Sequence, residues 1–87
     1  MKSANYEKLA AIFKEVLDLA PDRDPRNAIA GDDWSWDSLA HVSLVVALES
    51  EFSVSIDVDA SLSMTSFLDS VRILAAAGVT FSPEELP

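Results

Sequence analysis

The feature that most constrains this chain is the stretch from Trp34 to Phe52, which holds a turn, a helix start and the most apolar run. Asp37 and Ser38 are residue types that cap helices, because their side-chain oxygens accept hydrogen bonds from the first free backbone N–H groups. A helix is therefore predicted to begin at these two residues. Ser38 then stands at its exposed N-terminal end, where any chemistry of this stretch is displayed.

The predicted helix has apolar residues on more than one face. The face that must pack against the rest of the protein consists of Leu44, Val45, Leu48 and Phe52. A flank of this face carries Leu39, Val42 and Val46. This pattern fits either a helix surrounded by other helices or a helix with an exposed apolar strip kept for a partner.

Length and charge set the first limits on function. With 87 residues and no internal repeat, we expect one domain, 1–87, with a core of about 5–77. The formal net charge is −9, from 15 acidic and 6 basic residues, so little in the chain could neutralise a phosphate backbone. Nucleic-acid binding is therefore excluded. The acidic balance either attracts partners with basic surfaces or only keeps the protein soluble.

The absence of cysteine excludes disulfides, thiolate catalysis and cysteine-based metal sites. No apolar run approaches the roughly 20 residues that span a bilayer, and the polar N-terminus carries no apolar signal region. We therefore expect a cytoplasmic monomer that does not bind membranes.

A first helix is predicted at the N-terminus. Ser3 or Asn5 could cap it, and Pro21 should end it because proline disfavours helical geometry at Ala20. The apolar positions that keep helical spacing are Tyr6, Leu9, Ile12, Phe13, Val16, Leu17 and Ala20.

A long connection then runs from Asp22 to Trp36, in which Ile29 is the only aliphatic residue large enough to anchor the loop. Such a loop is uncommon in a small domain and is usually functional or well packed. Two tryptophans two residues apart cannot both face inward on an extended chain. We expect one of Trp34 and Trp36 to tether the loop to the core and the other to lie partly exposed beside Ser38.

The alternation of Val54, Ile56 and Val58 has the period of a strand, but the chain offers no second strand to pair with it. We therefore predict an extended linker that leads into a short helical turn near residues 57–62. Thr65 should cap a last helix and Gly78 should end it, with a frayed tail over residues 79–87. The predicted fold is an all-α four-helix bundle with three longer helices, one short helix and a long loop between the first two.

Few residues of the chain could serve catalysis or bind a metal. Ser38 and His41 lie three apart on the predicted helix, with Asp37 adjacent, but no third group orients them and a small bundle has no cleft that excludes water. We expect an exposed surface histidine and no enzyme activity. The loop aspartates lack the spacing of a calcium site; they are Asp22, Asp24, Asp32 and Asp33.

Around Ser38 the sequence resembles the acyl carrier proteins of fatty-acid, polyketide and related synthases. Trp36-Asp37-Ser38-Leu39 is similar to the Asp-Ser-Leu attachment motif of that family, and the likeness extends from about Asn5 to Ala77. The residues that match the helix after the motif are Val42, Leu44, Val45, Ala47, Leu48, Glu49, Glu51 and Phe52; those that match the later pattern are Ile56 and Met64-Thr65-Ser66-Phe67.

The resemblance implies that Ser38 carries 4′-phosphopantetheine, which a holo-carrier-protein synthase (a phosphopantetheinyl transferase) takes from coenzyme A. Acyl groups would be held as thioesters on the end of this arm and presented to acyl-loading and acyl-processing enzymes with basic docking surfaces. By the same resemblance the docking face would consist of Asp37, Leu39, Val42, Val46, Glu49 and Glu51.

Departures from the family pattern bear on the pathway. Ala40, Ser43 and Ser50 stand where fatty-acid carriers usually place acids, and Ser35 stands where a glycine is common. We interpret these as signs of a dedicated pathway. Two alternatives stay open: an aminoacyl or peptidyl carrier with the same fold and anchor, and an unmodified acidic helical interaction module in which Ser38 is only a helix cap.

Overall fold

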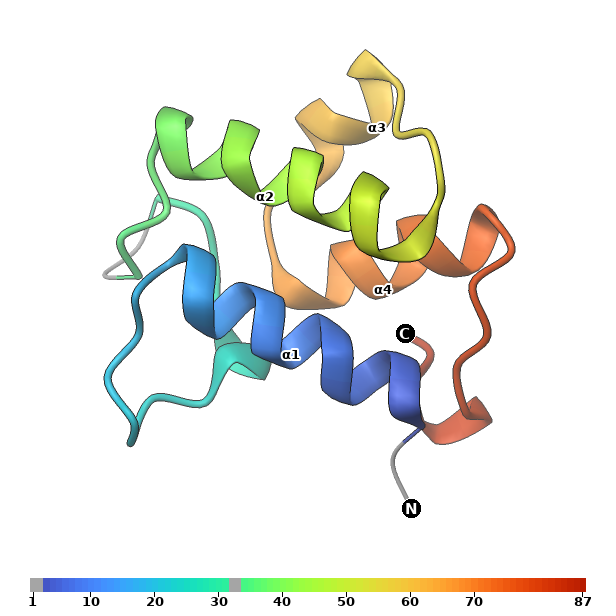
Figure 1. Cartoon of the computed structure of the whole chain (residues 1–87), viewed down its shortest axis with the longest axis horizontal. Coiled ribbons are helices and arrows are strands. Elements are labelled where there is room, and N and C mark those ends of the chain that lie inside the picture. The colour runs from blue at the N-terminus through green and yellow to red at the C-terminus, as the bar shows by residue number, and fades with distance from the viewer. Residues whose placement is uncertain (1–2, 32–33) are drawn as a thin grey trace.

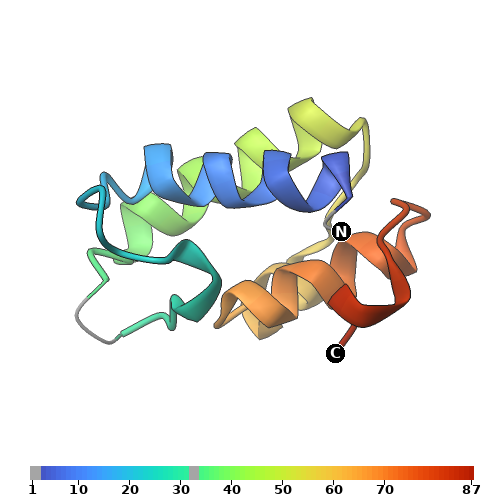
Figure 2. The same cartoon turned by 90° about the horizontal axis from the view of Figure 1, so that it is seen from below.

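The computed structural model describes residues 3–31 and 34–87, and the regular elements of this part are helices joined by loops (Figure 1). α1 and α2 lie side by side, and α4 packs beneath them (Figure 2). The predicted fold class, an all-α four-helix bundle, is confirmed. The described residues form three longer helices and one short helix, with a long connection between α1 and α2. The elements in order are α1 Ala4–Val16, η1 Pro25–Asn27, α2 Ser38–Phe52, α3 Val58–Ser63, α4 Phe67–Ala76 and η2 Pro83–Glu85, where η denotes a 3-10 helix.

α1 begins at Ala4, directly after its cap Ser3, and ends earlier than Pro21 suggested. The Ser3 hydroxyl oxygen accepts the Tyr6 N–H at 3.2 Å, so Ser3 and not Asn5 is the cap. Asp18 adopts a left-handed conformation with φ of 51°, and the Leu19 N–H donates to the Lys14 carbonyl at 3.0 Å. This backbone turn ends the helix, so the predicted extension to Ala20 was wrong.

Aromatic side chains run through the core in edge-to-face contacts. Phe67 lies 5.4 Å from Tyr6 and 5.0 Å from Phe13, measured between ring centroids, and Phe13 lies 5.4 Å from Trp36. Phe81 joins the chain at 6.5 Å from Tyr6. Edge-to-face pairs add about 0.5–1.5 kcal/mol each beyond their buried area, so these rings stabilise the contact of α1 with α4 and with the long loop.

The long loop is fixed to the start of α4. The Ala30 N–H donates to the Thr65 carbonyl at 2.8 Å, and the Phe67 N–H donates to the Ala28 carbonyl at 3.0 Å. Side chains alternate along this short antiparallel contact, so Ala28 is buried while its neighbour Ile29 points outward and is exposed. The prediction that Ile29 anchors the loop was therefore wrong.

The burial of the two tryptophans divides as predicted, but it is the buried Trp36, and not Trp34, that lines a surface hollow together with Ser38. Trp36 is buried against Phe13, and Trp34 is half-buried with the Arg23 guanidinium 3.9 Å from its ring centroid. Trp36 therefore tethers the end of the loop directly before α2.

The segment from α2 to α3 is extended, as predicted. Val54 and Ile56 are half-buried and pack against the core, and Asp57 caps α3 by accepting the Ala60 N–H at 2.7 Å. No residue of α3 is buried. The short helix therefore lies on the surface of the bundle.

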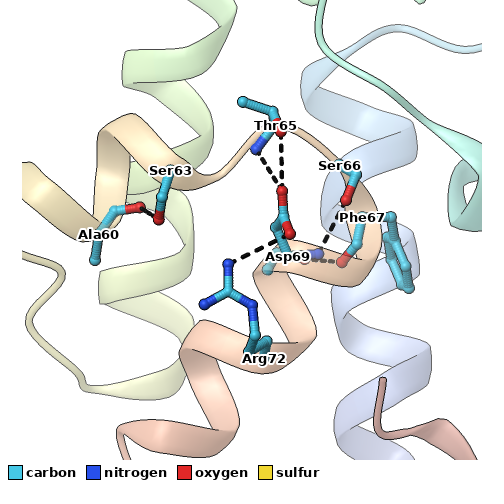
Figure 3. A network of polar contacts seen from close by, with 8 residues as sticks. Ala60, Ser63, Thr65, Ser66, Phe67, Asp69 and Arg72 are labelled. Carbon is cyan, nitrogen blue, oxygen red and sulfur yellow. Dashed lines mark hydrogen bonds and ion pairs between the residues drawn. The ribbon is translucent and has the colours of Figure 1, made fainter.

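α4 is capped by Ser66 and not by Thr65 (Figure 3). The Ser66 hydroxyl oxygen accepts the Asp69 N–H at 3.0 Å, while Thr65 donates its own N–H and hydroxyl to the Asp69 carboxylate at 3.0 and 2.9 Å. Partial burial acts to raise the pKa of Asp69, but these bonds and the charge of Arg72 outweigh it and hold the pKa below its usual value.

The C-terminal tail is packed, and the expectation of a frayed end was wrong. Gly78, with φ of +100°, ends α4 as predicted. Phe81 is then buried against Tyr6, and the Glu85 carboxylate accepts the Ser3 N–H at 2.7 Å and the Ser3 hydroxyl at 2.8 Å. These contacts tie the tail to the residue that caps α1. Figure 1 shows the C-terminal tail returning to the N-terminal end of α1.

Candidate functional site

The start of α2 separates two roles that the sequence assigned jointly to Asp37 and Ser38. The Asp37 Oδ1 accepts the Ala40 N–H at 2.8 Å, and the Asp37 carbonyl accepts the His41 N–H at 2.9 Å, so Asp37 is the cap. Ser38 is the first residue of the helix and is exposed. In the part of the chain that the structure describes, no hydrogen bond engages its hydroxyl. The Ser38 Oγ is therefore available for covalent modification.

The electrostatics of this position suit an anion. α2 has 15 residues, and the first turn after the Asp37 cap carries no acidic side chain. The free N–H groups and the macrodipole at a helix N-terminus favour negative charge. A phosphate ester on the Ser38 Oγ would stand at this positive end, so the residues present fit such a group.

Directly beside Ser38, a polar chain links the loop, α2 and α3. The Trp36 Nε1–H donates to the His41 Nδ1 at 3.0 Å, and the two rings stack with centroids 6.0 Å apart. An indole N–H can only donate, so Nδ1 is the acceptor and the neutral imidazole carries its proton on Nε2. The Nε2–H then donates to the Ser61 carbonyl at 2.9 Å.

His41 is thus half-buried and structural, and the prediction of an exposed surface histidine was wrong. Both ring nitrogens are already engaged, so His41 is not positioned to take a proton from Ser38. Sequence reasoning also missed Ser61. The spacing of Trp36 and His41, five apart across a helix start, is the one signal that could have suggested a contact between them.

A groove of about 540 Å³ opens between α2 and α3 with Ser38 at its edge. Trp36 and Met64, both buried, lie at its base, and Val42 and Leu62 line it from α2 and α3. The lining around Ser38 is therefore mixed: Ala30, Trp36, Val42, Leu62 and Met64 are apolar, and Asp37, His41, Ser61 and Thr65 are polar.

The six predicted docking residues do not all share one surface role. Asp37 and Glu51 are exposed at opposite ends of α2. Glu49 differs, because its side chain is half-buried and its Oε2 accepts the Ile56 N–H at 2.8 Å. Its carboxylate therefore orders the linker between α2 and α3. The exposed apolar residues of α2 are Leu39, Val42 and Val46.

The loop aspartates form no metal site in the described ranges, where no cluster of three potential ligands occurs; Asp32 and Asp33 lie outside those ranges. None of the helices described is long and apolar enough to cross a membrane.

The four-helix bundle with a free serine hydroxyl at the start of α2 defines a small carrier-type domain. A family profile described as "Phosphopantetheine attachment site" matches residues 7–72 and so covers most of the bundle. The chain therefore belongs to this phosphopantetheine-carrying family.

The fold is also similar to a chain in a solved structure described as "The ishigamide ketosynthase/chain length factor". The two chains share 27% sequence identity with a TM-score of 0.67, and the match covers 84% of this chain and 92% of that chain. The high coverage of both indicates that the matched chain has a similar length.

Proposed function

We propose that Ser38 is the residue that carries 4′-phosphopantetheine and that the protein is an acyl carrier without catalytic activity of its own. The observation that carries this proposal is the division of roles at the start of α2: Asp37 caps the helix and leaves the exposed Ser38 hydroxyl unengaged. When bound, the arm supplies a terminal thiol on which acyl groups are held as thioesters.

The attachment chemistry requires a partner enzyme. The bond from the Ser38 Oγ to the phosphorus of phosphopantetheine forms while the pyrophosphate bond of coenzyme A breaks. The other half of coenzyme A, adenosine 3′,5′-bisphosphate, leaves with the electron pair of the broken P–O bond, and the hydroxyl proton passes to a base. His41 has both ring nitrogens engaged and Asp37 is committed to capping, so neither is placed as the base. A phosphopantetheinyl transferase supplies that base, and this chain presents the nucleophile and a helix N-terminus that favours the anionic product.

For the pathway, we propose a specialised, polyketide-type route, with acyl-loading and acyl-processing enzymes as partners. Two observations support this: the similar solved structure is that of a ketosynthase and chain length factor, and Ser43 and Ser50 are exposed on α2 where fatty-acid carriers usually have acids. The net charge of −9 favours approach to enzymes with basic surfaces.

The test is the intact mass of the purified protein before and after incubation with coenzyme A and a broad-specificity phosphopantetheinyl transferase. We expect the wild type to gain one phosphopantetheine and Ser38→Ala to gain none. Ser43→Ala, which removes another exposed hydroxyl of α2, is the matched control and should be modified like the wild type.

Two outcomes would contradict the proposal. Modification of Ser38→Ala would place the arm on another residue, and no gain by the wild type with a competent transferase would leave an unmodified helical interaction module. Once the arm is attached, parallel loading with malonyl and aminoacyl groups by their transferases separates the acyl carrier from the aminoacyl alternative.

A further inference from the structure

His41 ties three segments of the chain together beside Ser38. The Trp36 Nε1–H, at the end of the long loop, donates to the His41 Nδ1 at 3.0 Å, and the two rings stack with centroids 6.0 Å apart. On its other side, the His41 Nε2–H donates to the Ser61 carbonyl of α3 at 2.9 Å. The end of the loop is therefore linked to α2 and α3 through one imidazole ring.

The two bonds of this ring respond differently to a proton. Nδ1 accepts a hydrogen bond only while the ring is neutral, because an imidazolium ion carries an N–H on both nitrogens. After protonation, two N–H groups would face each other across the 3.0 Å between the His41 Nδ1 and the Trp36 Nε1. The bond to the Ser61 carbonyl survives and becomes stronger, since its donor is now charged. The imidazolium therefore stays with α3 and releases Trp36.

The released indole has water within reach. Trp36 is buried, and a buried N–H without an acceptor is costly, so the ring cannot stay where it is. Its side chain lines the groove beside Ser38, and a small shift brings the N–H to the water of that groove. The residue before it, Ser35, has a left-handed φ of 57°, which a residue with a Cβ keeps only where its surroundings hold it. The loop end before Ser38 therefore has a latched and a released arrangement.

Few other charges act on the His41 ring. Among the residues that line the groove, Asp37 is the only other one with a titrating side chain, and its carboxylate favours the imidazolium. From Ser38 to Leu48, α2 carries no Asp, Glu, Lys or Arg. The charged groups of the neighbouring α3 and α4 line a separate hollow or pair with one another; they are Asp57, Asp59, Asp69 and Arg72.

Ser38 is placed to influence this ring. Residues three apart on a helix are neighbours, and the side chains of Ser38 and His41 line the same groove. A negative charge close to an imidazole favours its protonated form. A phosphate ester on the Ser38 Oγ would bring such a charge.

We propose that His41 is a proton-operated latch on the loop end before Ser38, and that negative charge on Ser38 opens the latch. In the unmodified chain, neutral His41 holds Trp36. A charged group on Ser38 favours the imidazolium and so releases Trp36 into the groove. The biological role of the latch rests on the proposed function, because the phosphate of the arm would supply the charge. The unmodified and modified forms then present different loop ends to the enzymes that act on them.

The test follows the two indole N–H signals of the full chain by proton–nitrogen NMR between about pH 8 and pH 5, where histidine takes up its proton. The chain has a single histidine, so the ring signals of His41 report its protonation directly. As His41 takes up its proton, the Trp36 N–H should lose its hydrogen-bonded shift and exchange with water roughly tenfold faster. Trp34, whose ring faces the Arg23 guanidinium, is the internal control and should change little.

The effect of charge on Ser38 is measured in the unmodified chain. Ser38→Asp adds a carboxylate, and Ser38→Asn is the matched neutral control. The pH at which half of Trp36 is released should be roughly 0.5–1 pH unit higher in Ser38→Asp than in Ser38→Asn, as expected for one charge about 6 Å away near the surface. His41→Gln keeps an acceptor but does not titrate, so it should make the Trp36 signal independent of pH.

Four results would overturn the inference. Three of them are a Trp36 signal that does not follow the protonation of His41, a Trp34 signal that changes as much as that of Trp36, and release at the same pH in Ser38→Asp and Ser38→Asn. The fourth is faster amide exchange in α3 with Trp36 still held, which would mean that the imidazolium leaves Ser61 instead.

The loaded protein separates the latch from the proposed function. The mass gain at Ser38 is measured first, and its absence refutes the proposed function, while the variants of the unmodified chain still decide whether the latch exists. After normal loading, the pH of Trp36 release should rise as it does in Ser38→Asp. An unchanged release pH in the loaded protein would refute the role of the arm in opening the latch.

Discussion

Replacing Asp37 by Ala should destabilise the protein by about 1 kcal/mol, while Ser38→Ala should change stability by less than about 0.5 kcal/mol. The difference follows from the bond between the Asp37 Oδ1 and the Ala40 N–H, which is the capping bond of α2. Ser38 makes no such bond within the described ranges, and Ala is a better helix former than Ser. In a domain of this size, the loss of about 1 kcal/mol lowers the melting temperature by about 4–8 °C.

The assay is thermal and urea unfolding of the apo-protein, followed by far-UV circular dichroism. Asp37→Asn is the matched control, because Asn caps helices about as well as Asp but carries no charge. It should retain most of the stability that Asp37→Ala loses. The opposite order, with Ser38→Ala destabilised and Asp37→Ala unchanged, would show that Ser38 is the true cap and that its hydroxyl is engaged in the folded protein.

Three further predictions concern stability. Gly78→Ala should lower the free energy of unfolding by about 1–2 kcal/mol, because the φ of +100° at this position strains any residue with a Cβ. Asp18→Gly should raise it, because Asp18 has a positive φ of 51° that glycine adopts without strain. Urea unfolding measures both changes. Leu48→Ala, at a fully buried position, should cost about 2–5 kcal/mol in the same assay. The pKa of Glu85 lies below its ordinary value of 4.5, because bonds from Ser3 and the Ser82 N–H outweigh desolvation. The contribution of the Glu85 carboxylate to folding stability is therefore present above pH 4.5 and is lost as the pH falls through its pKa in the folded protein. Acid should then speed amide exchange in the tail. Glu85→Gln should remove this pH dependence.

The start of α2 and the end of α4 could be predicted because they depend on local chemistry. The pair Asp37 and Ser38 indicated a helix start, and Gly78 indicated a helix end, since capping and left-handed turns involve residues only a few positions apart. The prediction that Thr65 caps the last helix was wrong, because Thr65 and Ser66 are both good caps and a single hydrogen bond, from the Asp69 N–H to the Ser66 hydroxyl, decides between them.

Contacts between distant segments could not be predicted from periodicity. The burial of Ala28 in place of Ile29 depends on the register of the loop against α4, which a pattern of residue types does not contain. The role of Glu49 depends on the linker that follows α2, and that of His41 on the placement of Ser61, twenty residues along the chain. The tail looked frayed because the contacts that hold Phe81 and Glu85 in place, to Tyr6 and Ser3, come from the opposite end of the sequence.

The contact between Ser3 and Glu85 has a consequence for how this domain can be built into larger assemblies. It brings the two ends of the described chain together at the end of the bundle opposite the start of α2 (Figures 1 and 2). A domain fused at either end, or a short peptide that joins the two ends into a circle, would lie at the other end of the bundle from Ser38, the first residue of α2. Ser38 is therefore accessible both when the domain is a separate protein and when it is one module of a multidomain synthase.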